Sequence, residues 1–290
     1  MQFVVGIVFR LSPAPPPPRL KNVADRTIVA ITGASSGIGA VFARKLAAEH
    51  DLLLIARRKE RLEELAGELT AAHPTHIEIL PADLAEESDL ESVASRIRGE
   101  SRLALLVNNA GFGTKGLFWE ADLASQERMH RLHVMATVRL THAVLQNMVA
   151  RDFGGIINVA SVSAFVRSPG SVSYGATKSW MTVFTEGLYL ELKNARSNVT
   201  MQALCPGFTY SEFHETMAVS RSRLAGPRFW MSAESVVDAS LDGLRRRKLF
   251  VIPGWRYLLL TTVLSKLPTA ARLGVEAAAG RAKLARQLHD

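Results

Sequence analysis

TIVAITGASSGIG, residues 27–39, joins a short apolar run to a glycine-rich turn and a helical pattern. β-branched residues are frequent in the run 27–32, as in a buried strand, and helical periodicity begins near residue 38. Because Gly33, Gly37 and Gly39 lack side chains, the backbone can turn sharply and bring its N–H groups to a pyrophosphate at the helix N-terminus. The segment therefore predicts a nucleotide-binding strand, turn and helix, although a tight turn without a ligand would use the same glycines.

Short apolar runs alternate with helical patterns along most of the chain. The expected strands are residues 27–32, 51–56, 76–80, 103–107, 155–160, 198–204 and 248–252. The expected helices are residues 38–49, 59–72, 87–99, 122–150, 174–194 and 233–246. Such alternation is typical of βαβ units that build a parallel sheet with helices on both faces. We predict an α/β fold, a doubly wound (Rossmann) seven-stranded parallel sheet in a single domain.

Composition divides the chain into three parts. With 290 residues, 48% of them hydrophobic and 21% charged, the chain is long enough for one large globular domain. Residues 1–22 include a proline run and are expected to form a disordered Pro-rich extension, with a PxxP ligand as the alternative. Residues 23–252 hold the predicted sheet, and residues 253–290 form a basic amphipathic C-terminal extension.

Cysteine content and apolar runs indicate the compartment. The single cysteine, Cys205, excludes an intramolecular disulfide and a thiolate metal site, which fits a reducing, cytoplasmic location. The histidines have no metal-like partners, so no metal site is expected. No apolar run reaches the roughly 18 to 20 residues that a membrane-spanning helix needs.

The net charge of +8 is concentrated at the C-terminus, where residues 245–290 carry ten Lys or Arg and two Asp or Glu. The rest of the chain is neutral and has no zinc-finger spacing, so nucleic acid is not expected as a partner. An apolar block from Trp255 to Leu267, followed by a basic helical pattern, suits peripheral contact with an anionic membrane surface. The alternatives are packing of this block on the domain, as a lid or dimer contact, and a solvated disordered tail.

Unusual residues follow the expected strands, at the sheet edge where doubly wound folds bind ligands. They are Asn108-Asn109-Ala110-Gly111, Ser161, Tyr174-Gly175-Ala176-Thr177-Lys178 and Pro206-Gly207, in addition to the TGxxxGxG pattern of residues 32–39. In this order and at these separations, over residues 25–252, they resemble the motifs of the short-chain dehydrogenase/reductase (SDR) family. The resemblance implies hydride transfer between a nicotinamide cofactor and a small-molecule carbonyl or alcohol substrate. We also expect a homo-oligomer, a dimer or tetramer.

The cofactor is expected to be NADP(H). Dehydrogenases that select NAD place a carboxylate at the end of the second strand, where this chain has Ala56 followed by Arg57 and Arg58. Arginine can hold a 2′-phosphate by a charge-assisted hydrogen bond, whereas cations that merely begin a helix oppose its dipole. A solvated helix start is the alternative interpretation. On the family pattern the cofactor-binding residues are Gly33, Ser35, Ser36, Gly37, Ile38, Gly39, Arg57, Arg58, Asp83, Leu84, Asn109, Ala110, Gly111, Tyr174, Lys178, Pro206, Gly207 and Ser211. Asp83 could instead be the N-cap of the next helix.

The resemblance assigns catalysis to Ser161, Tyr174 and Lys178. Tyr174 and Lys178 are four residues apart on one helical face, so the ammonium, together with the positive nicotinamide ring, is expected to lower a tyrosine pKa that is ordinarily near 10. Tyr174 would exchange a proton with the substrate oxygen, to which Ser161 would also hydrogen-bond. Where the family has an asparagine that anchors a proton-relay water, this chain has His133, either a relay group or a buried core histidine.

The long segment after Pro206-Gly207, residues 208–231, is rich in apolar residues and is expected to cover the substrate or to pack beneath a surface loop. Cys205 has no paired base and is expected to be a buried apolar residue. We predict an NADP(H)-dependent ketone or 3-oxoacyl reductase, with the direction following from the expected NADP preference. The alternatives are a steroid or sugar-alcohol dehydrogenase and a non-catalytic nucleotide-binding or scaffold protein.

Overall fold

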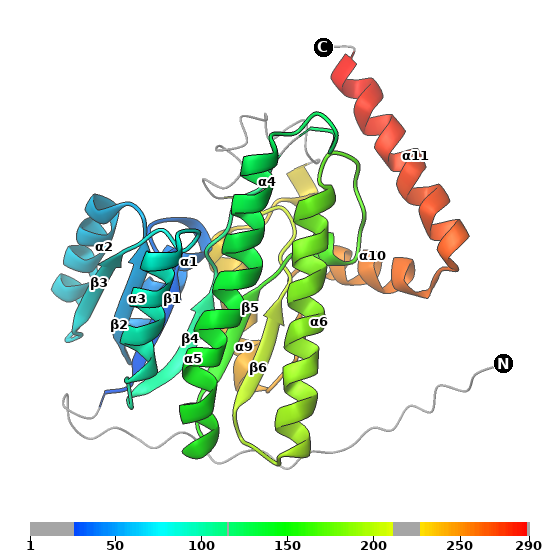
Figure 1. Ribbon diagram of the computed structural model, residues 1–290. Helices are drawn as coiled ribbons and strands as arrows, with labels where there is room; N and C mark the ends of the chain where they lie inside the picture. Colours follow the sequence, from blue (N-terminus) through cyan, green and yellow to red (C-terminus); the bar gives the residue numbers. More distant parts are fainter. Residues whose placement is uncertain (1–25, 115, 211–226, 289–290) are drawn as a thin grey trace.

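A parallel sheet lies between two layers of helices in the computed structural model, which describes residues 26–114, 116–210 and 227–288 (Figure 1). The strands are β1 (Ile28–Thr32), β2 (Asp51–Ala56), β3 (Ile77–Pro81), β4 (Leu103–Asn108), β5 (Gly155–Val159), β6 (Thr200–Leu204) and β7 (Phe250–Val251). Their order across the sheet is β3-β2-β1-β4-β5-β6-β7, with every neighbouring pair parallel. The predicted seven-stranded doubly wound fold is thus confirmed. The winding reverses between β1 and β4, where such folds bind ligands.

The helices are α1 (Gly37–Leu46), α2 (Lys59–Ala72), α3 (Glu87–Arg98), α4 (Leu123–His130), α5 (Ala136–Ala150), α6 (Val172–Asn194), α9 (Ala233–Arg245), α10 (Trp255–Lys266) and α11 (Thr269–Leu288). Alternation along the strands sends side chains to two cores. Val29 and Ile31 of β1 pack with α1, α2 and α9, whereas Ala30 packs with α3, α5 and α6. Both faces of the central strands are therefore buried, which explains their continuous apolar runs.

The predicted helix 122–150 is the main departure from the expected elements. It is interrupted by a π-helical turn, η2 (Arg131–Met135), between α4 and α5. Two strands, β6 and β7, are also shorter than predicted by more than one residue. β6 begins at Thr200 because Asn198 is held outside the ladder by Asp152, whose Oδ1 accepts its backbone N–H at 2.6 Å and whose Oδ2 accepts its amide at 2.6 Å. β7 pairs with β6 only at Phe250 and Val251.

The C-terminal residues form two helices that follow β7. α10 packs on the domain through Tyr257, Thr261 and Leu264, which are buried, and α11 continues from it beside the loop that precedes α6 (Figure 1). None of the helices in the described part of the chain is long and apolar enough to cross a bilayer. The predicted Pro-rich extension, residues 1–22, lies outside the described residues.

Candidate active site

A cavity of about 990 Å³ is formed at the carboxyl edge of the sheet, where the segments that follow β1, β2, β4, β5 and β6 meet. Nearly all the predicted cofactor and catalytic residues line it. Those that do are Gly33, Ser35, Ser36, Gly37, Ile38, Arg57, Arg58, Asp83, Leu84, Asn109, Ala110, Gly111, Ser161, Tyr174, Lys178, Pro206 and Gly207. Gly39 and His133 lie behind its wall, and Ser211 is outside the described residues.

The turn after β1 has the shape of an anion-binding helix start. Gly33 and Gly37 have φ values of 67° and 54°, a region that favours glycine. Ser36, the N-cap of α1, makes no side-chain capping hydrogen bond. The first N–H groups of α1 are therefore left for a ligand in the cavity. Gly39 serves the packing of the turn, since a Cβ there would lie 2.3 Å from the Gly33 carbonyl oxygen.

Thr32 and Asn109 tie this turn to the end of β4. Thr32 Oγ1 accepts the backbone N–H groups of Asn109 at 2.9 Å and Ala110 at 3.0 Å. In return, Asn109 Nδ2 donates to the carbonyl oxygens of Thr32 at 2.8 Å and Gly33 at 3.2 Å. Asn109 thus shapes the glycine turn directly. Thr32 belongs to the TGxxxGxG pattern, but this role was not predicted for it because the role depends on the neighbouring strand.

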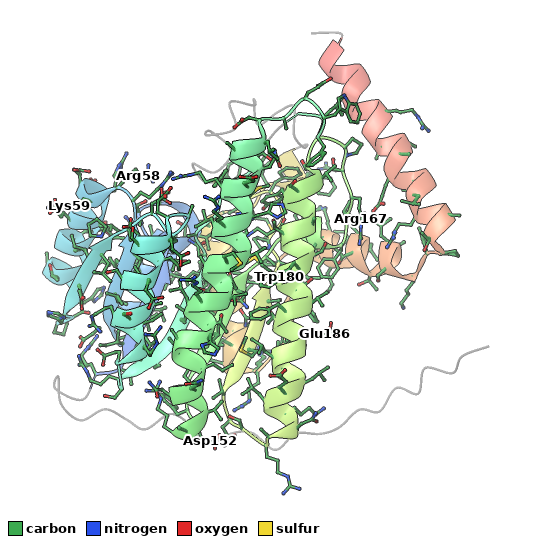
Figure 2. The ribbon with its side chains drawn as sticks, in the orientation of Figure 1. Arg58, Lys59, Asp152, Arg167, Trp180 and Glu186 are labelled. Carbon is green, nitrogen blue, oxygen red and sulfur yellow. The ribbon has the colours of Figure 1, made fainter. Side chains whose placement is uncertain are left out.

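Arginine lies at the end of the cavity beside α2. Arg58 Nη2 donates to the hydroxyl oxygens of Ser35 and Ser36, each at 3.0 Å (Figure 2). Arg57 is mostly exposed, with its guanidinium 3.9 Å from Asp83. Two guanidinium groups and two serine hydroxyl groups therefore lie near Ala56, and residue 56 is an alanine, which carries no carboxylate. This donor set fits a phosphate group.

Asp83 does not cap the following helix. α3 begins at Glu87 with Glu86 as its N-cap, so the N-cap interpretation of Asp83 is wrong. Instead its carboxylate accepts the Ala85 N–H at 3.0 Å and a hydrogen bond from Arg128 of α4. Asp83 thereby links the loop after β3 to α4 at the rim of the cavity.

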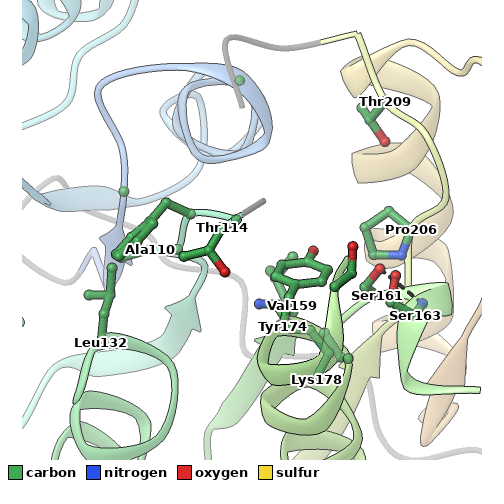
Figure 3. A pocket seen from close by; sticks show the side chains of 18 of the residues that line it. Ala110, Thr114, Leu132, Val159, Ser161, Ser163, Tyr174, Lys178, Pro206 and Thr209 are labelled. Atoms are coloured by element: carbon green, nitrogen blue, oxygen red, sulfur yellow. Dashed lines mark hydrogen bonds between the residues drawn. The ribbon is translucent and has the colours of Figure 1, made fainter. Parts of the chain in front are cut away.

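Ser161, Tyr174 and Lys178 meet at the cavity floor (Figure 3). Ser161 follows β5 and begins the 3₁₀ turn η3 (Val162–Ala164), where its Oγ accepts the Ser163 N–H at 3.1 Å and is hydrogen-bonded to Tyr174. Tyr174 and Lys178 lie in the first turns of α6. Lys178 Nζ is 5.7 Å from the centre of the Tyr174 ring and donates to the Val159 carbonyl oxygen at 2.8 Å.

Burial moves the pKa values of this pair in opposite directions. Burial raises the pKa of Tyr174 to about 12, although the hydrogen bond from Ser161 opposes the change. Burial also lowers the pKa of Lys178 to about 7. Lys178 therefore does not lower the Tyr174 pKa here, because desolvation of the phenol dominates and the amine is held on Val159, while the effect of the nicotinamide ring stays a prediction. At neutral pH Tyr174 is a neutral phenol.

His133 joins three parts of the site from behind the wall. It is fully buried in the π-helical turn η2, its Nε2 accepts the Phe112 N–H at 3.2 Å, and its Nδ1 lies 2.9 Å from Thr177 Oγ1. Thr177 Oγ1 in turn donates to the Tyr174 carbonyl oxygen at 2.9 Å. These partners assign the ring proton to Nδ1, and burial, with the positive charge of Lys178, holds the His133 pKa well below its usual value. Both ring nitrogens of His133 are therefore hydrogen-bonded to protein groups. These partners are a backbone amide and a hydroxyl, and not the backbone carbonyl expected for a buried core histidine.

Among the described residues, the site contains neither a reactive cysteine nor a cluster of metal ligands. Cys205 is buried, and its burial raises the thiol pKa to about 12. It is therefore protonated at neutral pH, as expected of a small apolar residue. Among the described residues no three His, Cys, Asp or Glu side chains are grouped as metal ligands.

Comparison with known proteins gives the family. Residues 27–221 match the model of the short chain dehydrogenase family, a span that contains all the motifs described above from Thr32 to Gly207. The chain belongs to the short-chain dehydrogenase/reductase family. α9, α10 and α11 of this SDR lie beyond the matched residues.

Relatives of this SDR include several reductases. Sulfoacetaldehyde reductase 2 of Chromohalobacter salexigens is 37% identical over 64% of this chain and 74% of its own. The very-long-chain 3-oxoacyl-CoA reductase of Anas platyrhynchos is 27% identical over 80% of this chain and 75% of its own. A short-chain dehydrogenase from Sphingobium yanoikuyae in complex with NADPH is 36% identical, with a TM-score of 0.75, covering 84% of this chain and 97% of its own.

The substrate end of this SDR is built largely from residues that the sequence analysis missed. They are Phe112, Thr114, Leu117, Val162, Val166, Pro169, Thr209, Ala277, Gly280 and Arg281. The last three come from α11, more than 90 residues after Tyr174 in the chain. None of the residues in this list belongs to a recognisable motif, so only the folded chain brings them to the cavity.

Tyr257 of α10 anchors the segments on either side of residues 211–226. Its hydroxyl accepts the Phe208 N–H at 3.0 Å and donates to the Phe229 carbonyl oxygen at 2.6 Å. Its ring lies so close to Gly207 that a Cβ there would be 2.1 Å from a ring carbon. The glycine of the Pro206-Gly207 motif is therefore required by a residue of the C-terminal extension.

Proposed function

We propose that this protein is an NADPH-dependent reductase of ketones. The observation that carries the proposal is the convergence of Ser161, Tyr174 and Lys178 at the floor of a cavity whose other end holds the glycine turn, Arg57 and Arg58. The nicotinamide cofactor supplies the hydride when bound. Relatives and the glycine cradle support a nicotinamide cofactor of this kind.

The proton chemistry favours reduction. A phenol with a pKa of about 12 keeps its proton at neutral pH, so Tyr174 can donate it to a substrate oxygen as negative charge develops there. The Ser161 hydroxyl, already hydrogen-bonded to Tyr174, can donate to the same oxygen and stabilise that charge. A charged Lys178, close to the Tyr174 ring, lowers the energy of the phenolate that remains.

The preference for NADPH rests on the end of β2. Ala56 offers no carboxylate to a ribose 2′-hydroxyl, and Arg58, held against Ser35 and Ser36, can bind a 2′-phosphate. The complex of the Sphingobium yanoikuyae relative with NADPH supports this choice. Losing one charge-assisted phosphate contact costs about 1.5 to 3 kcal/mol, or roughly ten- to a hundredfold in affinity.

We propose that the substrate is a ketone with an apolar body. Phe112, Leu117, Val162 and Val166 make much of the substrate end apolar. A solved relative described as a bulky-bulky ketone specific alcohol dehydrogenase from Comamonas testosteroni, 32% identical with a TM-score of 0.71, supports this class. A 3-oxoacyl thioester is the second candidate, favoured by the similarity to the Anas platyrhynchos 3-oxoacyl-CoA reductase.

The test is oxidation of NADPH and NADH by the full chain, with ketones of graded size and a 3-oxoacyl thioester as substrates. We expect turnover with NADPH, loss of turnover in Tyr174→Phe with NADPH binding kept, and normal turnover in Tyr189→Phe, a control on the same helix that does not line the cavity. Arg58→Gln should weaken NADPH binding about tenfold or more without affecting NADH, whereas Arg61→Gln should change neither. Substantial activity in Tyr174→Phe, or equal binding of both cofactors by the parent chain, would contradict the proposal.

We further propose that the protein is a cytoplasmic homo-oligomer with peripheral attachment to anionic membranes. The exposed side of α10 carries Trp255, Leu258, Leu259 and Val263, and the guanidinium of Arg256 lies 4.7 Å from the Trp255 ring centre. Apolar side chains on α6, including Val183 and Leu190, are also exposed and suit a contact between subunits. Sedimentation velocity at micromolar concentration tests the oligomer, and a species of monomer mass alone would contradict it.

A further inference from the structure

α11 is fastened to the loop that connects two catalytic residues. This loop, residues 165–171, runs from η3, which begins at Ser161, to α6, which carries Tyr174. Glu276 of α11 is only 6% exposed, and its Oε1 accepts the Arg167 N–H at 2.9 Å. Arg167 is drawn between α6 and α11 in Figure 2. A buried carboxylate bound to a backbone amide fixes α11 against this loop.

A close contact one turn further along α11 sets the distance to the same loop. Gly280 packs on Pro169 so tightly that a Cβ at position 280 would lie 2.7 Å from Pro169 Cγ. No side chain fits there without moving the helix or the loop. Glu276 and Gly280 are four residues apart and therefore share one face of α11, which faces the loop.

The same face of α11 reaches the cavity. Ala277, Gly280 and Arg281 line it, opposite the catalytic floor and together with Pro169 of the loop. Ala278, the next residue, is exposed and does not line the cavity. At Ala277 and Gly280 the helix thus presents almost no side-chain volume to the substrate end.

We propose that α11 is the outer wall of the substrate subsite and that Ala277 and Gly280 set the size of ketone the enzyme accepts. The small residues leave room for a bulky apolar group beside the carbonyl carbon, within the cavity that α11 and loop 165–171 line together. The inference rests on the proposed ketone reductase function and specifies its substrate class. α11 lies beyond residues 27–221, which the family model matches.

The test introduces volume at the wall in the full chain. Ala277→Phe is compared with Ala278→Phe, which adds the same group one residue along the helix, using butanone as the small ketone and 1,2-diphenylethanone as the large one. For Ala277→Phe we expect kcat/KM for the large ketone to fall by about tenfold or more and that for the small ketone to stay within about twofold. Ala278→Phe should change neither value.

A second readout keeps the two proposals separate. The rise in Tm that each ketone produces in the presence of NADPH reports binding without turnover, and Ala277→Phe should lose the rise from the large ketone only. A parent chain that binds both ketones but reduces neither would refute the reductase function and leave the wall supported. Equal effects of Ala277→Phe on both ketones, or no effect on the large one, would overturn the wall.

The attachment of α11 has its own measurement. Hydrogen exchange at the Arg167 amide should be slow in the parent chain and at least about tenfold faster in Glu276→Ala, because the carboxylate that accepts this N–H is gone. Val275→Ala, at the exposed neighbouring position, is the matched control and should leave the exchange rate unchanged. Equal rates in Glu276→Ala and the parent would show that α11 does not rest on the loop.

Discussion

Lys178 shows how burial couples the chemistry of a single residue to the stability of the protein. Its pKa falls from 10.5 to about 7, so between these values the unfolded chain binds a proton that the folded chain does not. The free energy of unfolding must then rise with pH, by up to about 1.4 kcal/mol per pH unit, in the part of this window where, of Lys178, Cys205 and Tyr174, only Lys178 titrates. The raised pKa values of Cys205, from 9.0, and of Tyr174, from 10.0, act in the opposite direction above pH 9 and pH 10.

We therefore expect Lys178→Met to flatten the pH dependence of stability. Urea unfolding without added cofactor at pH 7, 8 and 9 should show the parent chain gaining stability relative to this variant as pH rises, since the cost of burying the ammonium disappears. Lys193→Met, an exposed position on the same helix, is the control and should keep the parental slope. Parallel curves for the parent and Lys178→Met would contradict the lowered pKa.

His133 is expected to position its neighbours without relaying a proton to or from the substrate. His133→Phe keeps a ring but leaves the Phe112 N–H without its acceptor, at a cost of about 1 to 3 kcal/mol in unfolding free energy. We expect kcat to fall in this variant, while the profile of kcat between pH 5.5 and 8.5 keeps its shape. His133→Gln, which retains a donor and an acceptor, should recover part of the loss. A proton relay through His133 would instead show a titration near neutral pH that disappears in His133→Phe.

At the residue scale, sequence predicted the groups whose chemistry is unusual for their position. Ser161, Tyr174, Lys178 and the glycines stand out because few structural roles require them in that order. Thr32 and Thr177 do not stand out, since a threonine beneath a site looks like any threonine in a strand or helix. The direction of the Tyr174 pKa also depends on burial, which the local sequence does not contain.

Among the elements, α10 holds the two chain segments that flank residues 211–226. Its Tyr257 hydroxyl is the shared partner of Phe208 and Phe229, so one side chain holds both in place. The other two buried residues described on α10 are Leu264, which has no polar side-chain atom, and Thr261, whose hydroxyl donates to the Tyr257 carbonyl oxygen. Among these buried residues, only Tyr257 can therefore hydrogen-bond to the Phe208 N–H and the Phe229 carbonyl oxygen.

Tyr257→Phe should loosen these segments while leaving the cofactor end intact. We expect a loss of about 1 to 3 kcal/mol in unfolding free energy, because the Phe208 N–H and Phe229 carbonyl lose their partner. KM for the ketone should rise with little change in the affinity for NADPH. Urea unfolding and steady-state kinetics check this, with Tyr189→Phe as control. An unchanged KM would show that Tyr257 does not order the substrate side.

The elements that sequence predicted well are those whose periodicity is complete within one segment. β1 and α2 follow the expected ranges to within a residue because alternation and 3.6-residue spacing are local properties. The π-helical turn at Arg131–Met135 was missed, since it adds a residue to a helix without changing its composition. The start of β6 was missed because Asp152, far earlier in the chain, holds Asn198.

For the whole molecule, the structure shows one of the arrangements left open by the sequence of the C-terminal extension, its packing on the domain, while membrane contact stays a proposal. One side of α10 packs on the domain, whereas Trp255, Leu258, Leu259 and Val263 remain exposed beside basic residues. Strand order and the path of α11 depend on contacts between distant segments, so the sequence could predict the sheet but not which helix closes the cavity.

Membrane attachment is tested by co-sedimentation of the full chain with vesicles of phosphatidylcholine alone or with 30% phosphatidylserine. We expect binding to the anionic vesicles at low salt and its loss in Trp255→Ser/Leu259→Ser, since both apolar anchors are removed and screening weakens the attraction of the basic residues. Phe153→Ser/Val149→Ser, which removes exposed apolar groups from the end of α5, is the control and should bind as the parent does. Absence of binding at low salt would exclude the membrane as the partner of α10.

The backbone bridge between Thr209 and Met231 has a consequence for how enzymes of this kind diversify. Tyr210 N–H donates to the Met231 carbonyl oxygen, and Met231 N–H to that of Phe208, each at 2.9 Å, so the chain departs from and returns to one point. An insertion, deletion or graft between these anchors changes the loop-closure entropy only slowly with length. Residues 211–226 can therefore be lengthened, shortened or exchanged while the two anchored ends keep their positions beside Pro206 and Gly207.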